Sequence, residues 1–443
     1  MDPTVRKLKI CVIGAGMGGL ACALALAKRG FEDIHVFEYA KDLGFVGAGI
    51  QLAPNMARIL DRLGVWADIE REAVILSDTS IRQGSTDNEL TKVDLGYVHS
   101  TYGYPHMVGH RSSLAGSIFR GCLREASIKF HFSTSVGNIE SFSPKPSFTA
   151  TPKNGDPPYR VEADILLGAD GVKSNTRVDM MTKIGATAEV IDSGSAAYRI
   201  MLTRDEMKHD PELLNLIDTD RATRWIGEKR HIIAYPVSEK NVYNISTAQP
   251  DANFAAAPSA TYTTKGSKKA MLSVYSDFCP MIQRMLNLVP EGEVCEWKLR
   301  VHSPLPTWVD GSVALVGDAC HPTLPHLAQG AAQAIEDAAV LGVVLSRLPD
   351  ASPESINKAL RVYEQVRKER AETLVELAAA SGRALHLGEG AAKEERDRLF
   401  AASKKGDGPV PDKWADADVQ KMIYGHDCMK VAEDVFQENF DRL

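Results

Sequence analysis

A glycine-rich turn close to the start of the chain limits the folds that the chain can adopt. The apolar run at residues 8–13 predicts a buried parallel strand, and Gly14, Gly16 and Gly19 lie between that strand and a helix predicted over 19–29. In such a turn the first glycine permits the tight bend, the second lets a pyrophosphate approach the backbone, and the third lets the helix pack on the strand. The segment therefore predicts the first strand and helix of a dinucleotide-binding fold.

A second strand and an acidic residue support this prediction. Residues 34–37 form another short apolar run that ends at Glu38, whose carboxylate could accept hydrogen bonds from ribose hydroxyls. An acidic side chain there disfavours a 2′-phosphate, so the adenosine would belong to FAD or NAD. The uncharged run from Ile10 to Ala27 also resembles a signal peptide or a membrane span, but the glycines within it favour strand and helix. We expect neither a targeting segment nor a membrane partner.

A second motif follows a predicted strand late in the chain. Asp318 comes directly after the apolar run at 313–316, where its carboxylate could accept from a sugar-alcohol chain. Gly330 and Ala331 open a long predicted helix, so their N–H groups could stabilise negative charge on a ring carbonyl. Within this region His321 could be catalytic or could fix the turn.

A third motif, Asp170-Gly171-x-x-Ser174-x-x-Arg177, follows the short apolar strand at 165–167. Here Ser174 could cap a helix, and Arg177 could lie near dinucleotide phosphates and so bridge two bound cofactors.

Composition excludes several classes of protein. Lys plus Arg is 51 and Asp plus Glu is 58, which gives a formal net charge of −7 and no broadly basic face for nucleic acid. An anionic substrate must therefore be held by a few individual cations. The seven cysteines are odd in number and include no C-x-x-C pair, a pattern typical of reduced thiols in an intracellular enzyme. We expect a cytoplasmic protein without a disulfide framework or a metal site.

The order of the predicted elements indicates an interrupted architecture. A length of 443 residues predicts two or three domains, and a β-α-β unit precedes alternating strands before strand-helix character returns. We expect a nucleotide-binding domain built from 1–75, 105–185 and 300–350, a mainly antiparallel sheet domain from 76–104 and 186–299, and a helical segment at 351–443. The helical segment could serve a homodimer interface.

Taken in order, these motifs resemble the single-component flavin-dependent aromatic hydroxylases, the group A flavoprotein monooxygenases. Within that group the chain is most similar to the salicylate hydroxylase-like branch, including its fungal members. The resemblance extends almost from end to end, through Gly47 to Leu52 with Pro54-Asn55, His110-Arg111, Tyr363 to Arg370, His386 to Gly390, and Tyr424 to Asp427.

The resemblance implies an α/β fold: a Rossmann-like FAD-binding domain with an inserted antiparallel substrate sheet and C-terminal helices, as in p-hydroxybenzoate hydroxylase. It implies FAD on the glycine-rich turn, Glu38 at its ribose and Asp318 at its ribityl chain. Further FAD contacts would come from Gly49, Arg111, Pro325, Gly330 and Ala331. It also implies that NADH or NADPH docks transiently near Asp170 and Arg177, without a nucleotide fold of its own.

The resemblance further implies hydroxylation of a phenolic ring with O2. His231 and Tyr235 lie four residues apart on a predicted strand, hence on one face, and resemble the phenol-activating pair of hydroxybenzoate hydroxylases. Arg199 is the candidate for holding a carboxylate or phenolate, although an arginine near a domain join is often structural. His326, atypical for the family, could touch substrate or fill space.

Several substrates remain open at this point. Salicylate to catechol and 4-hydroxybenzoate to hydroquinone lead, with decarboxylation if the carboxylate-bearing carbon faces the flavin. The alternatives are a heteroaromatic or polyketide phenol substrate, or a flavin-binding module that is not an enzyme.

Overall fold

The strand that precedes the glycine-rich turn lies inside a mostly parallel sheet. The computed structural model describes residues 2–44, 48–187, 189–253, 263–404 and 409–443, so Gly47 lies outside the described residues. The described residues form a six-stranded sheet in the order β19 (Val309–Asp310), β20 (Val313–Leu315), β12 (Ile165–Gly168), β1 (Lys9–Ile13), β2 (Asp33–Phe37) and β8 (Ile128–His131). Neighbouring strands pair in parallel except for β19 and β20, which are antiparallel.

Helices rich in small apolar residues cover this sheet. In α2 (Met17–Lys28) every residue from Gly19 to Leu26 is buried, and it packs against α12 (Gly330–Ser346). A helix that is apolar on all sides must be enclosed by other elements, and here α6 (Arg111–Leu123) also lies against α2. The uncharged N-terminal run therefore forms the strand and helix predicted from its glycines. Within the described ranges, no helix has both the length and the apolarity to cross a bilayer.

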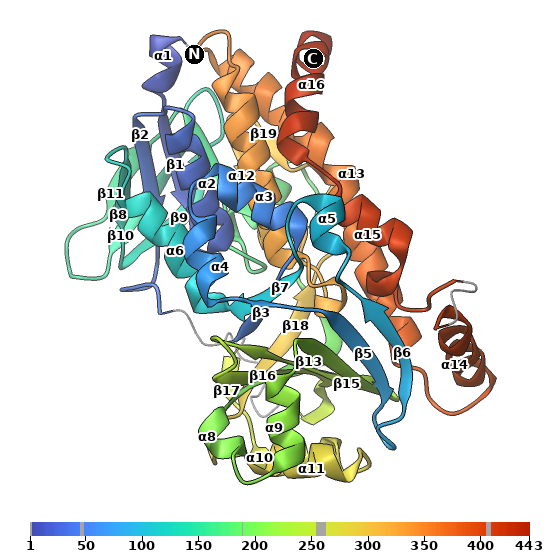
Figure 1. The fold of residues 1–443 in the computed structure, drawn as a ribbon. Helices are drawn as coiled ribbons and strands as arrows, with labels where there is room; N and C mark the ends of the chain where they lie inside the picture. The colour runs from blue at the N-terminus through green and yellow to red at the C-terminus, as the bar shows by residue number, and fades with distance from the viewer. Residues whose placement is uncertain (1, 45–47, 188, 254–262, 405–408) are drawn as a thin grey trace.

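The second large sheet is mainly antiparallel and lies below the first in Figure 1. Its eight strands run in the order β17 (Thr263–Lys265), β18 (Cys295–Val301), β13 (Ile191–Thr203), β16 (Val242–Pro250), β15 (Arg230–Val237), β14 (Arg221–Gly227), β5 (Asp78–Gln83) and β6 (Glu89–Asp94). Its far face is covered by α8 (Arg204–Met207), α9 (Pro211–Asp218), α10 (Lys268–Val274) and α11 (Pro280–Asn287). The other face of this sheet points toward the parallel sheet.

Two small sheets complete the core. One contains β9 (Thr134–Ser141), β10 (Ser147–Pro152) and β11 (Tyr159–Glu162); the other contains β3 (Gly49–Leu52), β7 (Met107–His110) and β4 (Val74–Ile75). Near β3 lie the helices α3 (Pro54–Arg62), α4 (Trp66–Glu72) and α5 (Val98–Tyr102), while α7 (Asn175–Lys183) packs on β9. The fold is thus the mixed α/β class that the sequence predicted.

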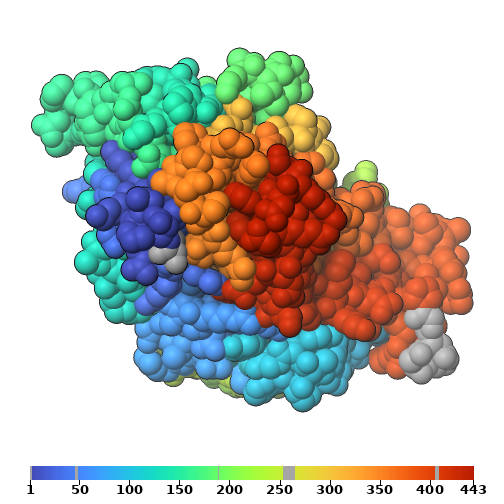
Figure 2. All heavy atoms as spheres, turned by 90° about the horizontal axis from the view of Figure 1, so that it is seen from above, coloured from blue at the N-terminus to red at the C-terminus, as the bar shows by residue number. Residues whose placement is uncertain are grey.

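A single long helix joins the two large sheets. The 33 residues of α13 (Pro353–Leu385) correspond to about 50 Å of helix. Near one end Tyr363 donates to the carbonyl of Leu315 on β20, and at the other His386 reaches β15. The remaining helices are α14 (Ala391–Ser403), α15 (Ala417–Tyr424) and α16 (Cys428–Arg442). Seen from above, the orange and red C-terminal helices lie beside the blue N-terminal segment (Figure 2).

Candidate active site

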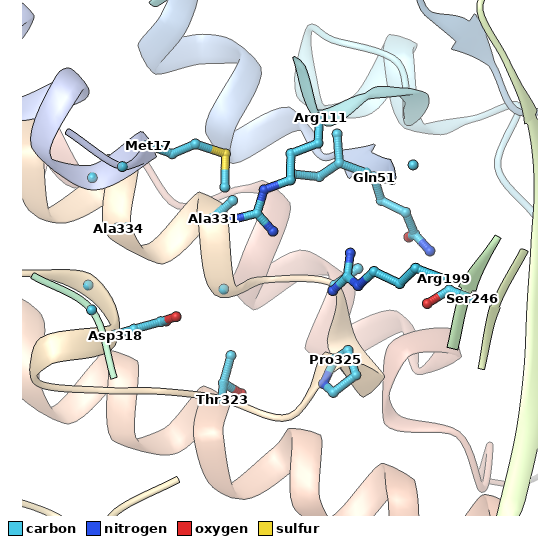
Figure 3. A pocket seen from close by; sticks show the side chains of 18 of the residues that line it. Met17, Gln51, Arg111, Arg199, Ser246, Asp318, Thr323, Pro325, Ala331 and Ala334 are labelled. Atoms are coloured by element: carbon cyan, nitrogen blue, oxygen red, sulfur yellow. The ribbon is translucent and has the colours of Figure 1, made fainter. Parts of the chain in front are cut away.

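A cavity of about 380 Å³ lies between the glycine-rich turn and the open face of the eight-stranded sheet (Figure 3). Its walls come from four places: the glycine-rich turn, the strand β3 with the start of α6, the loops around Asp318 and Pro325, and the sheet itself. Among the sequence-predicted residues, the cavity is lined by Gly16, Gly49, Arg111, Arg199, His231, Tyr235, Asp318, Pro325, Gly330 and Ala331. The fold therefore brings most of the predicted cofactor and substrate residues together.

The glycine-rich turn is shaped by close backbone contacts. Gly14 has a φ of +96°, and a Cβ there would lie 2.5 Å from the carbonyl oxygen of Ala169. A Cβ at Gly19 would lie 1.9 Å from the carbonyl oxygen of Gly14, so neither position admits a side chain. A Cβ at Gly16 would meet nothing within 4 Å and would enter the cavity. Gly14 and Gly19 shape the turn from behind, and Gly16 leaves room for a ligand.

Two helices begin at the cavity without a side-chain cap. Gly16, which has no side chain, is the N-cap of α2, and Gln329 is the N-cap of α12, where its side chain makes no capping hydrogen bond to a backbone N–H. Met17, Gly330 and Ala331 of the first turns line the cavity. Uncapped N–H groups and the positive ends of the helix dipoles favour anionic groups, so these helix starts fit the pyrophosphate and a flavin ring carbonyl.

Acidic side chains flank this end of the cavity. The Glu38 carboxylate accepts from the backbone N–H groups of Ala15 at 2.8 Å and Ala40 at 2.7 Å, which fixes it at the edge of the glycine-rich turn rather than in the cavity wall. Asp318 points into the cavity (Figure 3). Its enclosure by protein raises its pKa, although His321 and Arg111 act in the opposite direction.

The loop that carries Asp318 is held by a buried polar network. Asp337 accepts from the backbone N–H of Gly317 at 2.9 Å and contacts Nε2 of His321 at 2.6 Å, while Arg367 donates to its other oxygen at 2.8 Å. His321 is buried and is not part of the cavity wall. Of its two predicted roles, the structure favours fixing the turn.

Asp170 and Arg177, the residues predicted near the nicotinamide nucleotide, both have hydrogen-bond partners within the protein. Arg177 is fully buried, and its guanidinium donates to the carbonyls of Ala319 at 3.2 Å and Val172 at 2.7 Å. Asp170 turns toward the helix α7, where it accepts from the hydroxyl of Ser174 at 2.6 Å. Ser174 caps that helix, as predicted. Neither side chain is part of the wall of this cavity, and both support the start of α7. Docking of NADH or NADPH near them stays a prediction.

The register of the eight-stranded sheet sets the substrate end of the cavity. Arg199 on β13 pairs with Ser246 on β16, Ser246 with Ile233 on β15, and Ile233 with Arg224 on β14. Directly opposed residues share a sheet face, so these four side chains form one row across four strands. All four line the cavity.

Arg199 presents an unsatisfied charge to this row. Its side-chain Nε is buried and has no hydrogen-bond partner in the described part of the chain, and its guanidinium lies 5.2 Å from the ring of Trp297. Burial lowers the pKa of Arg199, and the nearby charge of Arg111 lowers it further. Figure 3 shows the guanidinium groups of Arg111 and Arg199 entering the same part of the cavity. Asp318 also acts on Arg111, but the two guanidinium groups that converge here still form a receptor for an anionic ligand.

His231 and Tyr235 line the cavity from the same strand face, as their spacing predicted. Burial raises the pKa of Tyr235 and lowers that of His231, so both are neutral at neutral pH. Nδ1 of His231 shares a hydrogen bond of 2.7 Å with Nε2 of His386. His326 lies behind His231, with ring centroids 5.4 Å apart, and is not part of the cavity wall. The structure therefore favours packing for His326 over contact with substrate.

Sequence reasoning missed Arg224 and Ser246. Ser246 follows from the strand register, because it lies between Arg199 and Ile233, but register is not visible in one sequence. Arg224 is buried and forms an ion pair of 2.8 Å with Asp412, which lies 188 positions further along the chain. No local sequence pattern indicates that partner.

Comparison with known proteins agrees with this geometry. The model of the "FAD binding domain" family matches residues 7–378. The chain is 34% identical over 370 residues to 3-hydroxybenzoate 6-hydroxylase 1 of Aquipseudomonas alcaligenes, covering 81% of this chain and 84% of that protein. It is 31% identical over 430 residues to the FAD-dependent monooxygenase ntnJ of Nectria sp, covering 96% of each. It is 30% identical over 383 residues to 6-hydroxynicotinate 3-monooxygenase of Bordetella bronchiseptica, covering 82% and 89%.

Solved structures share the whole fold. A salicylate hydroxylase in complex with substrate superposes with a TM-score of 0.77 at 21% identity, covering 96% of this chain and 97% of that one. CtdE in complex with FAD and its substrate gives a TM-score of 0.80 at 18% identity, covering 98% and 99%. At these identities the likeness shows the common architecture.

Proposed function

Because the chain belongs to the FAD-binding-domain family and is a flavoprotein aromatic monooxygenase, we propose that its substrate is a small hydroxylated aromatic carboxylic acid. NADH or NADPH would be the reductant and O2 the source of the new hydroxyl oxygen. The observation that carries this proposal is the buried Nε of Arg199, which has no hydrogen-bond partner among the described residues and lies beside Arg111 in the cavity wall.

The residues present fit FAD at the end of the cavity nearer the glycine-rich turn. The start of α2 at Gly16 would hold the pyrophosphate, and Glu38 the ribose. Asp318 would hold the ribityl chain, and Gly330 with Ala331 would contact the ring system. The chemistry that bound FAD supplies is acceptance of a hydride from the nicotinamide and activation of O2.

At the sheet end, this chain's residues would orient and deprotonate the substrate. Arg199 would bind the carboxylate by charge-assisted hydrogen bonds and so fix the ring in one orientation. His231, which lines the cavity, would accept the phenol proton, since an electron-rich phenolate is more readily hydroxylated. The buried side chains His231 and Tyr235 would limit the access of water to the reacting oxygen.

The polar side chains at the sheet end and the named relatives favour a hydroxylated acid. Arg199, Ser246 and Arg224 lie in one row across the sheet and line the cavity. Two named relatives act on 3-hydroxybenzoate and 6-hydroxynicotinate, both monocyclic hydroxylated acids. We therefore extend the proposed substrates to these two acids, beside salicylate and 4-hydroxybenzoate, and include the heteroaromatic ring that the sequence left open.

The test is a substrate panel on the purified, FAD-loaded chain. Oxidation of NADH and of NADPH, with uptake of O2, is measured with each of the four acids. We expect at least one acid to accelerate both, with formation of a hydroxylated product. Carboxyl-labelled substrate then decides decarboxylation, because a retained label rejects loss of CO2. A yellow protein that responds to none of the acids but to a polyketide phenol would overturn the proposal.

The variant Arg199→Gln tests the carboxylate contact directly. Loss of one charged hydrogen-bonding partner should raise KM for 3-hydroxybenzoate at least about tenfold. KM for 3-hydroxybenzyl alcohol, which lacks the carboxylate, should change much less. Arg383→Gln, on an exposed part of α13, is the matched control and should behave as the unmodified chain. Equal losses with the acid and the alcohol would show that Arg199 has a structural role instead.

A further inference from the structure

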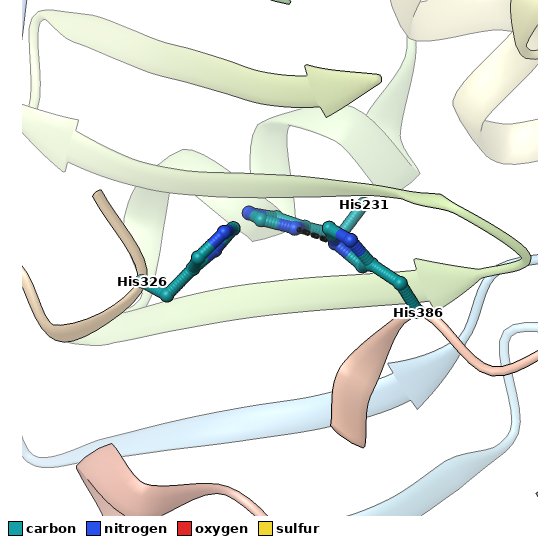
Figure 4. Close-up of side chains that lie close together, drawn as sticks. All are labelled: His231, His326 and His386. Atoms are coloured by element: carbon teal, nitrogen blue, oxygen red, sulfur yellow. Dashed lines mark hydrogen bonds between the residues drawn. The ribbon is translucent and has the colours of Figure 1, made fainter. Parts of the chain in front are cut away.

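Three histidines from distant parts of the chain meet behind the substrate end of the cavity. His231 lies on β15, His326 lies in the short 3-10 turn Pro325–Leu327, and His386 directly follows α13 (Figure 4). Their ring centroids form a nearly equilateral triangle with sides of 5.0, 5.4 and 5.4 Å. One nitrogen of each ring lies within 4.8 Å of the chosen nitrogens of the other two. Three imidazoles therefore converge on one small volume.

All three rings are held in the uncharged form. Burial lowers the pKa of His326 to about 3 and that of His386 to about 4, and it also lowers the pKa of His231. A neutral imidazole is the form that binds metal ions, because its free lone pair is available. The cluster therefore needs no deprotonation at neutral pH before it can bind a cation.

The surrounding backbone fixes the rings. A Cβ at Gly382 would lie 2.6 Å from Cδ2 and Nε2 of His326, so the glycine makes room for that ring against α13. The N–H of Lys229 donates to the carbonyl of His386 at 2.9 Å, which anchors the end of α13 to the turn before β15. Nδ1 of His326 is buried and has no hydrogen-bond partner among the residues that the structure describes. A buried nitrogen without a partner is costly unless a ligand satisfies it.

We propose that His231, His326 and His386 form a binding site for a divalent transition-metal ion of the zinc class. Imidazole ligands suit Zn²⁺, whose Zn–N bonds of about 2.0–2.1 Å place tetrahedral ligand atoms roughly 3.3 Å apart. Nδ1 of His231 and Nε2 of His386 lie 2.7 Å apart, so binding must open this hydrogen bond by about 0.6 Å. His386 is partly exposed at a helix end, which gives it freedom to move and gives the ion a path from solvent.

The charges around the cluster set the strength of the site. Arg224 opposes positive charge on all three rings, but it is balanced by Asp412 at 2.8 Å. Arg396, which acts on His386, is paired with Asp397 at 2.8 Å. The cluster itself contains no thiolate or carboxylate, so we expect micromolar affinity, weaker than that of structural zinc sites.

Occupancy of the site would stop hydroxylation. A neutral imidazole bound to a metal carries its one proton on the other nitrogen, so His231 could no longer accept a proton from the substrate. This consequence rests on the proposed function, whereas binding of the ion does not.

The experiment uses the FAD-loaded full chain, freed of metal with a chelator and then titrated with ZnCl2 in a calorimeter. We expect one ion per chain, at least a hundredfold weaker binding in His326→Gln and in His386→Gln, and unchanged binding in His209→Gln, an exposed control. Co²⁺ in place of Zn²⁺ should give tetrahedral absorption at longer wavelengths than the flavin bands. With a turned-over substrate, Zn²⁺ should inhibit the unmodified chain reversibly but not His386→Gln.

Binding is measured without substrate, so its outcome is separate from that of the substrate panel. Absence of saturable binding at millimolar Zn²⁺ would overturn the proposed site. Binding that persists undiminished in the double variant His326→Gln/His386→Gln would do the same, since it would place the ion elsewhere. Because His386 is partly exposed, His386→Gln should fold even if the more buried His326→Gln does not, and circular dichroism with flavin content checks each variant.

Discussion

Replacement of Arg367 by methionine should destabilise the chain and loosen its cofactor site together. The Arg367 guanidinium is fully buried and donates to Asp337 at 2.8 Å, to the Gln333 side chain at 2.6 Å and to Glu336. Removal of one partner from a buried ion pair costs about 3–5 kcal/mol, because the remaining charge is left uncompensated. Arg370 still donates to Glu336 at 2.8 Å, so we expect the lower end, about 3 kcal/mol.

The assay is thermal unfolding of the FAD-loaded chain, with flavin release followed by fluorescence. For a chain of this size, about 3 kcal/mol corresponds to a fall of roughly 3 °C in Tm. Asp337 also fixes the N–H of Gly317 beside Asp318, so FAD affinity should fall about tenfold. Arg383→Met makes the same change on an exposed part of the same helix and should leave both quantities unaltered. If Arg367→Met and Arg383→Met both have the Tm of the unmodified chain, the buried network does not stabilise the fold.

The pH dependence of this effect gives an independent check. Burial alone would raise the pKa of Glu336, but Arg370 and Arg367 outweigh it and hold that pKa well below its ordinary value of 4.5. A carboxylate with a lowered folded-state pKa stabilises fully above its unfolded pKa and less as the pH falls below it. The difference in Tm between the unmodified chain and Arg367→Met should therefore be largest above pH 5 and shrink in more acidic buffer. A difference that grows on acidification would refute the ion-pair argument.

Two further predictions concern the glycine-rich turn and the proposed base. Gly19→Ala should lower the Tm of the flavin-free chain by several degrees, because its Cβ would overlap the carbonyl of Gly14. Gly16→Ala should leave that Tm unchanged but weaken FAD binding, since its Cβ enters only the cavity. Equal Tm values for flavin-free Gly19→Ala and Gly16→Ala would contradict these separate roles of the two glycines. Because burial holds the pKa of His231 well below 6.5, the base stays neutral as the pH falls, and kcat/KM for the accepted acid should remain level from pH 8 to about 5.5. An acid limb near 6.5 that is absent in His231→Asn would show that His231 is exposed to solvent during turnover.

Local patterns predicted those parts of the molecule that depend on local physics. The strand, turn and helix around Gly14 are encoded by contacts within a few residues, and period-two alternation was enough to place His231 and Tyr235 on one face. Arg177 shows what such reasoning does not reveal. Its position after a strand resembles that of a ligand-binding residue, yet its partner is the carbonyl of Ala319, 142 positions away, and only the folded chain reveals that it points inward.

At the substrate end, the sequence indicated individual residues but not which of them meet in space, for the same reason. The three histidines of the proposed metal site come from residues 231, 326 and 386, which no sequence spacing connects. The row containing Arg199 and Ser246 likewise depends on which strands pair and in which register. Both are properties of tertiary structure, which a single sequence does not specify locally.

The helix α13 sets a fixed distance between the cofactor end and the substrate end of the molecule. Arg367 on this helix bonds to Asp337 in the network beneath the Asp318 loop. His386 follows Arg367 by 19 positions and contacts His231. Insertion of one residue between them would rotate everything beyond it by about 100° and move it by about 1.5 Å. The number of residues between Arg367 and His386 is therefore constrained, even at positions where the type of residue is not. In related chains, a gap there would indicate a differently built substrate wall behind an intact flavin site.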